Sequence, residues 1–208
     1  QYTFYVPHDP KGLIQAIGKS AFNARLDSIF VQSEALGFSG GKNIDAFSGL
    51  EGLYNQGNQP NLHVSWLFNF SGKPSLTQKW VQEICNKFYG NEGIHGYGYG
   101  QDEDQGQLGA WYVMAAMGMF DVAGLTDAEA KMGLSTPLFD EIKIQLSPKY
   151  YGGKDFVIKK ENPAIGGIYI EQIKLNGKIV HEPFIPLKSI TAGGILELKT
   201  GNRPKDKY

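Results

Sequence analysis

The hydrophobic periodicity of this 208-residue chain changes near Ser135, and this change limits the folds open to it. Before Ser135, apolar residues recur at the three- and four-residue spacing of helices. After it, apolar and polar residues alternate, as they do in strands with one face on a core. The sequence therefore predicts a helical part with long glycine-rich loops, followed by a small antiparallel β domain.

Four helices are predicted in the first part, over residues 11–36, 62–71, 77–88 and 104–120. Gly37 is expected to end the first helix, because glycine tolerates the left-handed backbone that closes many helices. In the fourth helix, apolar residues at i, i+3, i+4, i+7 and i+11 predict a buried stripe. The stripe consists of Leu108, Trp111, Tyr112, Ala115 and Met119.

Four alternating runs predict strands in the last part, at residues 142–146, 156–158, 168–173 and 195–198. Asn176-Gly177 stands between two such runs and predicts a β-hairpin, because both residues tolerate the positive φ of a tight hairpin turn. We place the boundary of the two parts near residues 122–138. The expected domains are residues 1–122 and residues 123–208.

The charge balance restricts the partners. The net charge is −1 with Lys and Arg spread along the chain, which argues against nucleic acid or an anionic membrane, because either needs a basic patch. No apolar run approaches the ~20 residues that span a bilayer. The single cysteine, Cys85, excludes an intramolecular disulfide, and its place on a predicted helix face indicates a buried thiol.

Three consecutive acids stand at the end of a glycine-rich segment, directly before the predicted fourth helix. Asp102 and Asp104 are two positions apart, so they share a side in an extended segment. One interpretation is a helix cap, because Asp102 with Gln105 imitates a capping box. The other is a loop that holds carboxylates against a ligand or a water molecule. The sequence leaves both open.

Two motif-based alternatives fit this segment poorly. A helix–loop–helix calcium loop starting at Asp102 would place Val113 where a bidentate acid is needed. The glycines at 96, 98 and 100 lack the spacing and the preceding strand of a dinucleotide fingerprint. Glycine and aromatic residues are both abundant in the chain, a composition that suits stacking on flat ligands such as sugars.

Two further segments carry candidate ligands. Residues 54–63 are dense in neutral oxygen donors, including Asn58 and Gln59, which suit a hard cation such as calcium. The alternative is an ordinary Asn/Gly/Pro turn. His8-Asp9 precedes a predicted helix, where it is either a cap with a satisfied histidine or a site for sugar hydroxyls. We interpret His95 and His181 as surface or loop residues.

Taken together, these segments resemble glycoside hydrolase family 92, the calcium-dependent α-mannosidases. The block from Asp102 to Tyr112 is the most specific part of the resemblance. The other matching blocks are residues 1–9 with Gly12-Leu13, 26–30, 57–63, 70–74 with Thr77-Gln78, 137–139, and Tyr169-Ile170 with Asn176-Gly177.

The resemblance implies a fold and an activity. Members of the family join an N-terminal β-sandwich to an (α/α)6 barrel, so this chain would supply the last barrel helices and a closing β-rich segment. The implied activity is exo-acting hydrolysis of terminal α-linked mannose with inversion, with calcium on the O2 and O3 hydroxyls of the sugar. We expect α-1,2 linkages of N-glycans or mannans as substrates, and a periplasmic or secreted location.

The resemblance also implies roles for residues. Asp102 and Asp104 would activate the attacking water. Asn58 and Gln59 would lie in the calcium region. The substrate pocket or its surroundings would include His8, Asp9, His63 and Trp111.

The chain departs from the family pattern at two positions and in its extent. Gln59 stands where the family usually has Glu, which removes one negative charge near calcium, and Ser75 replaces a usual Trp. The family's general acid is a Glu expected upstream of Gln1. The isolated chain would then carry the base without the acid and be inactive, with the missing N-terminal half of the same enzyme as its natural partner.

Two alternatives to a hydrolase remain. One is a non-catalytic carbohydrate-binding or structural fragment, which could form a homodimer through helix faces that the missing half should cover. The other is a metalloprotein without glycosidase activity.

Overall fold

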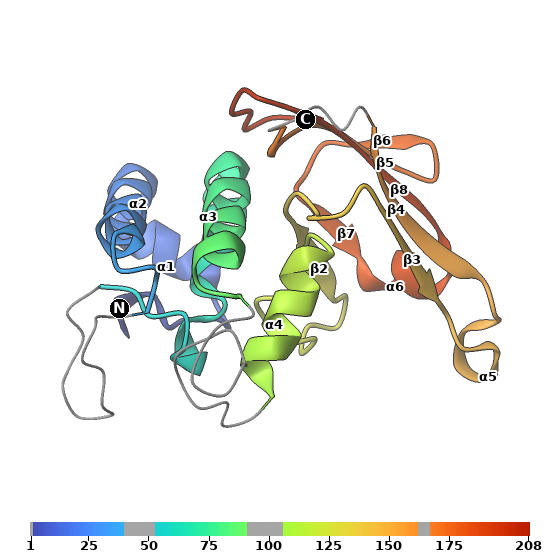
Figure 1. Cartoon of the computed structure of the whole chain (residues 1–208), viewed down its shortest axis with the longest axis horizontal. Helices are drawn as coiled ribbons and strands as arrows, with labels where there is room; N and C mark the ends of the chain where they lie inside the picture. The colour runs from blue at the N-terminus through green and yellow to red at the C-terminus, as the bar shows by residue number, and fades with distance from the viewer. Residues whose placement is uncertain (1, 40–52, 91–105, 162–166) are drawn as a thin grey trace.

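The computed structural model describes residues 2–39, 53–90, 106–161 and 167–208. Figure 1 shows three helices on one side, the strands on the other, and α4 between them. The helices are α1 (Pro10–Ile17), α2 (Lys19–Glu34), α3 (Pro74–Lys87), α4 (Gln107–Ala116), α5 (Pro148–Tyr151) and α6 (Leu187–Thr191). Short 3₁₀ helices cover Tyr2–Phe4, Gln59–Asn61 and Val64–Asn69.

The predicted helix over residues 11–36 is wrong in one respect, because two helices occupy that stretch. Gly18 separates them with a φ of 86°, a value that glycine adopts without a Cβ clash. Its N–H still donates to Ile14 O at 2.9 Å, and its carbonyl accepts from Phe22 N at 2.8 Å. The apolar spacing therefore continues across Gly18. For this reason the periodicity predicted one helix instead of two.

The other helix boundaries need smaller corrections. The predicted helix over 62–71 is a buried 3₁₀ helix, and α3 begins at Pro74, where proline needs no hydrogen bond for its nitrogen. The fourth helix begins at Gln107 rather than at 104. It ends at Ala116, shortly before Gly118 takes a left-handed φ of 73°, and Met119–Phe120 then forms strand β1. Hydrophobic periodicity does not show where the backbone changes from α-helical hydrogen bonds to those of a 3₁₀ helix or a strand.

The strands form two sheets. The smaller, in the order β1-β2-β7, pairs β1 with β2 (Lys131–Leu134) and β2 with β7 (Phe184–Pro186). The larger has the order β3-β4-β8-β5-β6. Its strands are β3 (Glu141–Gln145), β4 (Asp155–Glu161), β5 (Tyr169–Leu175), β6 (Lys178–Val180) and β8 (Gly194–Gly201).

The prediction of an antiparallel β part is only partly right. Strands β4 and β8 run parallel, from the pair Phe156 and Gly194 to the pair Glu161 and Lys199, so the larger sheet is mixed. Alternation in the sequence reports which face a residue takes, but not which strand lies beside it. The Asn176-Gly177 hairpin is confirmed, since it joins β5 to β6 with φ values of 51° and 77°.

Two hydrophobic clusters form the core. The first fills the helical part and contains Cys85, whose pKa burial raises to about 12, as expected of an inert buried thiol. The second is formed by residues of both sheets. Val122 packs in the first cluster and Met119 in the second, so the two clusters overlap along the chain there. The domain division after residue 122 stays a prediction.

Amide side chains join the helical part to the sheets. Gln78 of α3 accepts from Ile170 N at 3.0 Å and donates to Tyr208 Oη at 2.7 Å. Near it, Asn69 donates to Leu134 O at 3.1 Å. Asp206, near the end of the described chain, accepts from Ser75 N at the start of α3 at 3.3 Å. The sheet part is therefore tied to the helices through directional bonds as well as apolar packing.

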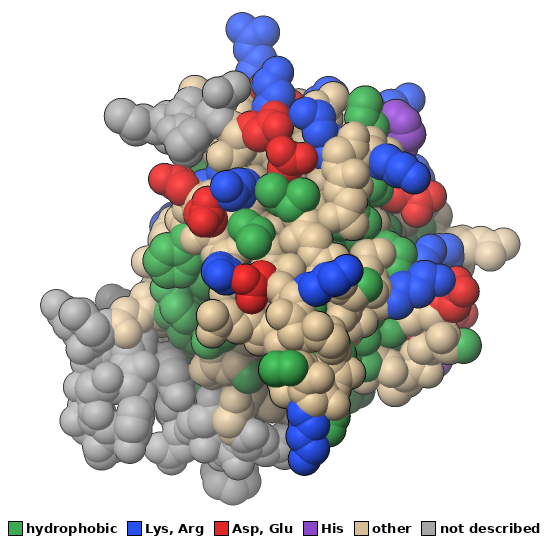
Figure 2. Space-filling model, turned by 90° about the vertical axis from the view of Figure 1, so that its right-hand side faces the viewer, with side chains coloured by type: hydrophobic (Ala, Val, Ile, Leu, Met, Phe, Trp, Pro, Cys, Tyr) green, Lys and Arg blue, Asp and Glu red, His purple; other side chains and the backbone are tan. Residues whose placement is uncertain are grey.

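The sheet surface carries both signs of charge. Figure 2 shows Lys and Arg side chains interspersed with Asp and Glu over this side of the molecule. Cross-strand ion pairs between β3 and β4 include Lys143–Asp155 at 2.6 Å and Lys159–Glu141 at 3.0 Å. Among the described residues, no helix has both the length and the apolar character needed to cross a membrane.

Candidate functional site

The segment from Tyr54 to His63 is a compact turn held by its own amides. Asn55 Oδ1 accepts from Gly57 N at 2.9 Å, and Asn61 Nδ2 donates to Asn55 O at 2.9 Å. Both asparagines are buried. Asn58 is half-buried and immediately precedes the 3₁₀ helix Gln59–Asn61. The turn interpretation of this segment is thus confirmed, and the turn leaves Asn58 partly open to solvent.

A chain of hydrogen bonds, buried at Tyr54 and Gln56 and part-buried at Tyr89, leads away from this turn. Tyr54 Oη donates to Gln56 Oε1 at 2.5 Å, and Gln56 Nε2 donates to Tyr89 Oη at 2.9 Å. Tyr89 Oη donates in turn to Leu108 O in α4 at 3.0 Å. Burial, with a contribution from Tyr89, raises the pKa of Tyr54 well above its ordinary value, so its hydroxyl stays a donor.

His63 connects the turn to the first residues of the chain. Its Nε2 lies 2.9 Å from Phe4 O, and its ring centroid lies 5.7 Å from that of Tyr5. Burial lowers the pKa of His63 more than its bonds to Phe4 O and Pro60 O raise it, which favours the neutral ring at pH 7. The predicted place of His63 near substrate stays a prediction.

Trp111 connects α4 to the same turn. Its Nε1 donates to Leu62 O at 2.8 Å, and its ring stacks on Tyr89 with centroids 5.7 Å apart. The side chain is 1% exposed, so the buried stripe predicted for the fourth helix includes it. Its predicted substrate role is untested, and its indole N–H already has a backbone partner.

His8 and Asp9 lie at the exposed start of α1. Asp9 is the N-cap, and its Oδ1 accepts from Gly12 N at 2.9 Å. A Cβ at position 12 would displace the Asp9 carboxylate from its present position, so glycine at this position favours the cap. The capping interpretation is confirmed, and the proximity of both residues to substrate stays a prediction. His181 is exposed, as expected.

The structure therefore brings together three of the predicted site segments. The turn at 54–63 contacts the N-terminal segment through His63 and Phe4. It contacts α4 through Leu62 and Trp111. These contacts join segments far apart in the sequence, which no local pattern shows.

The predicted base carboxylates, Asp102 and Asp104, lie outside the described residues, as does His95. The start of α4 nevertheless bears on the competing interpretation. The N-cap of α4 is Gly106, with a left-handed φ of 72°. The capping box predicted from Asp102 and Gln105 is therefore misplaced, because it would start the helix at 103.

The calcium prediction depends on the donor types that the turn presents. Asn58 and Gln59 carry amide oxygens, which calcium accepts as ligands. They fit calcium by chemistry, although neither adds charge. Within the described part of the chain, no group of three or more His, Cys, Asp or Glu side chains is placed to hold a metal. Calcium binding stays a prediction.

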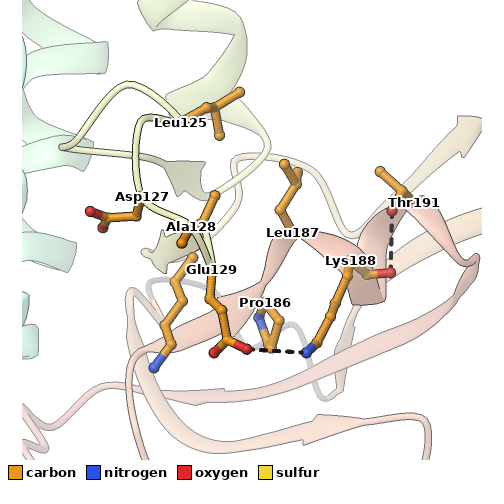
Figure 3. Close-up of a pocket in the computed structure, with 10 residues that line it drawn as sticks. Leu125, Asp127, Ala128, Glu129, Pro186, Leu187, Lys188 and Thr191 are labelled. Atoms are coloured by element: carbon orange, nitrogen blue, oxygen red, sulfur yellow. Dashed lines mark hydrogen bonds and ion pairs between the residues drawn. The ribbon is translucent and has the colours of Figure 1, made fainter.

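A surface hollow of about 470 Å³ lies elsewhere, between residues 125–131 and residues 186–191. Figure 3 shows Glu129 reaching toward Lys188 across it, an ion pair of 3.8 Å between two exposed side chains. None of the predicted site residues lines this hollow. An exposed ion pair of this kind contributes little energy, and we do not assign the site to it.

Comparison with known proteins decides the family. The family model described as the glycosyl hydrolase family 92 catalytic domain matches residues 1–202. The chain belongs to glycosyl hydrolase family 92. The predicted resemblance is thereby confirmed.

The family relatives include enzymes of known structure. The chain is 28% identical to a family GH92 α-mannosidase of Bacteroides thetaiotaomicron, with a TM-score of 0.80 over 99% of this chain and 25% of that one. The same enzyme is known in complex with mannoimidazole. A family GH92 inverting mannosidase of Bacteroides thetaiotaomicron VPI-5482 is 30% identical, with a TM-score of 0.78 over 99% of this chain and 27% of that one.

A curated relative is named an uncharacterized secreted glycosidase of Arthroderma benhamiae. It is 28% identical over 203 residues, which are 95% of this chain and 22% of the relative. The chain thus spans about a quarter of the length of these relatives.

Sequence reasoning missed the residues that connect the site segments. Gln56, Tyr54 and Tyr89 form the buried chain, yet no periodicity or motif singles them out. The one available signal was the density of amides between residues 54 and 63. It was interpreted as a set of possible ligands, whereas the side chains of Asn55, Gln56 and Asn61 are buried and bond within the protein.

Proposed function

We propose that this chain is part of an exo-acting α-mannosidase that removes terminal α-linked mannose with inversion and with calcium assistance. The observation that carries the proposal is the family match over residues 1–202. The structural likeness to a GH92 α-mannosidase, with a TM-score of 0.80 over 99% of this chain, supports it. The likeness to an enzyme named as an inverting mannosidase supports the stereochemistry.

Inversion requires two carboxyl groups on opposite faces of the sugar, roughly 6.5–9.5 Å apart, with room for a water between the base and the sugar. We assign the base to Asp102 and Asp104. We assign the acid to a part of the protein outside these 208 residues, in keeping with the share of the relatives that the chain covers. The helices would complete an (α/α)6 barrel with that part.

The turn and α4 supply the setting for this chemistry. Bound calcium would polarise vicinal hydroxyls of the sugar and favour the flattened ring of the transition state. Asn58 and Gln59 would hold it through their amide oxygens. The bonds of His63 to Phe4 O and of Trp111 to Leu62 O fix the backbone around the turn. This order favours a fixed geometry at the reacting centre.

We further propose α-1,2-linked mannose of N-glycans or mannans as the substrate, and a periplasmic or secreted location. The secreted glycosidase among the relatives supports the location. Comparing hydrolysis of α-1,2-, α-1,3- and α-1,6-mannobiose by the full-length protein tests the linkage, and a preference for another linkage would refute it.

The decisive experiment uses the full-length protein and its Asp104→Asn and Asp102→Asn variants. We expect loss of the base to lower kcat by roughly 10²–10⁴-fold, the usual contribution of general acid–base catalysis. Proton NMR of the first product should show β-mannose from an α-linked substrate. Asp127→Asn, at an exposed aspartate on the distant hollow, is the matched control and should leave kcat unchanged.

Three results would refute the proposal. Unchanged kcat in both variants would refute the assignment of the base to Asp102 and Asp104. Release of α-mannose as the first product would refute inversion. Wild-type protein that binds mannose without hydrolysing it would instead support the carbohydrate-binding alternative. Calcium titration with and without mannose tests the cofactor, because a shared site requires each ligand to tighten the other.

A further inference from the structure

We propose that Gln56 is a positioning residue, whose buried amide fixes the turn carrying Asn58 and Gln59 against the first turn of α4. The proposal rests on the proposed function, because it assigns that turn and that helix to the same active site. Gln56 itself is 0% exposed and is not a candidate to touch substrate.

The direction of the hydrogen bonds makes Gln56 the central link. Tyr54 is protonated and donates to Gln56 Oε1, which leaves the amide nitrogen to donate to Tyr89 Oη. Tyr89 has then accepted one bond, so its own proton is free to go to Leu108 O, which lies 3.0 Å away. Tyr54 and Gln56 are buried, and Tyr89 is part-buried. A hydrogen-bond network in such surroundings favours one arrangement of its members.

The chain joins three elements that the sequence separates widely. Tyr54 and Gln56 belong to the turn, Tyr89 directly follows α3, and Leu108 lies in the first turn of α4. The Tyr89 ring also stacks on Trp111, with centroids 5.7 Å apart. A shift at Gln56 would therefore be transmitted to α4 both by hydrogen bonding and by packing.

The candidate ligands are close to Gln56 in the chain. Asn58 and Gln59 follow it by two and three positions, and Asn58 N bonds back to Asn55 O at 3.3 Å. The turn is too short to absorb a displacement of Gln56 without moving these side chains. Because a misplacement of about 1 Å can lower a rate by roughly 10²-fold, the amide chain should matter to the rate while making no contact with the reacting atoms.

The test compares Gln56→Met and Tyr89→Phe with a control, all in the full-length protein. Gln56→Met keeps the length of the side chain and removes both hydrogen bonds. Tyr89→Phe removes only the hydroxyl and keeps the stacking, so it serves if Gln56→Met does not fold. The control is Gln82→Met, at a part-buried glutamine that donates to Thr136 O at 3.0 Å on the sheet side of α3.

Two readouts are needed. We expect kcat to fall roughly 10- to 100-fold in both test variants, with KM for an α-mannoside changed less than kcat, and the control to remain near wild type. By hydrogen exchange, amides of residues 57–62 and of residues 108–112 should exchange faster together. Those of β8 should not change.

The outcomes separate the two proposals. Faster exchange with unchanged kcat would overturn the positioning role and leave a structural one. Faster exchange in the turn alone, or in neither segment, would also overturn it. If the wild-type protein has no mannosidase activity, the proposed function fails, but coupled exchange of the two segments would still support the positioning of the turn by Gln56.

Discussion

The helical core and the sheet core of this chain are built from different side chains. The helical cluster is rich in rings, which contact one another at centroid distances such as 4.7 Å between Phe30 and Tyr54. The sheet cluster consists mainly of Ile, Leu and Met, with Phe156 as its one buried ring among the described residues. Large rings fill the irregular spaces between helices, whereas branched aliphatic side chains suit the regular surface of a sheet.

Buried polar side chains show the same contrast. The helical part buries Asn55, Gln56, Asn61 and His63 around one turn. In the described sheet part the buried polar side chains are Ser135, Thr136 and Thr200. A ladder satisfies its own backbone groups, whereas turns and 3₁₀ helices leave groups that side chains must bond. The predicted site thus lies where side-chain hydrogen bonds, rather than hydrogen bonds between strands, hold the backbone in place.

The largest expected effect concerns the ring cluster. Phe30 contacts Phe38, Tyr54, Phe68 and Trp80, so Phe30→Ala should lower the free energy of unfolding by about 3–5 kcal/mol. In the sheet core, Ile158→Ala likewise truncates a buried side chain to its Cβ. It should lower the free energy of unfolding by less, near the lower end of about 2–5 kcal/mol. Urea denaturation of both full-length variants checks this. Equal losses would remove the contrast between the two cores.

An intermediate effect is expected where the two regions meet. Gln78→Leu removes the acceptor of Ile170 N and the donor to Tyr208 Oη, and an unsatisfied buried group costs about 1–3 kcal/mol. Gln82→Leu, at a half-buried position where the amide donates to Thr136 O, should cost less. Thermal unfolding of the two variants measures the difference. If Gln82→Leu were the more damaging, the bonds of Gln78 would not be the main directional link between the two parts.

The smallest effect is a pH dependence at Asp206. Burial by itself raises the pKa of Asp206, but its bonds from Lys73 and Ser75 outweigh this and hold the pKa below its ordinary value. A carboxyl group with a depressed folded-state pKa stabilises the protein above its unfolded pKa of about 3.9, and this is lost as the pH falls through the folded value. Because the ion pair is partly exposed, the effect should stay below about 1 kcal/mol.

Urea midpoints measured from pH 6 down to pH 3 test this expectation. Asp206→Asn should lower stability above pH 4 and lose less of it than the wild type as the pH falls. Asp140→Asn removes an ion pair between the exposed Asp140 and the part-buried Lys160, both in the sheet part, and serves as the control. A wild-type pH profile that Asp206→Asn leaves unchanged would show that the bond between the two regions is worth nothing measurable.

Much of the local structure was predictable. Within α4, the predicted stripe is confirmed at Leu108, Trp111 and Ala115, whereas Tyr112 is part-buried and Met119 lies in β1. The Asn176-Gly177 hairpin follows from turn chemistry. The break at Gly18 was not predictable, because the apolar pattern continues across it. The parallel pairing of β4 with β8 also lay beyond the sequence, since alternation does not name a partner strand.

For the site, the sequence indicated the segments but not how they meet. Asn58, His63 and Trp111 were singled out from family resemblance, and the structure shows that the backbone near them is joined through Phe4 O and Leu62 O. Gln56 and Tyr89 were not singled out, because a buried amide in a turn has the same local sequence as an exposed one. Their importance appears only when the third element, α4, is in place.

The sequence by itself determined the change from a helical part to a strand-rich part, where one hairpin turns, and to which family the chain is related. These follow from interactions within a few positions and from a linear pattern of residue types. Only the tertiary structure decided that one amide chain would join the turn, the end of α3 and the start of α4. Hydrogen bonds between distant segments depend on their three-dimensional approach, which the packing of the whole core sets.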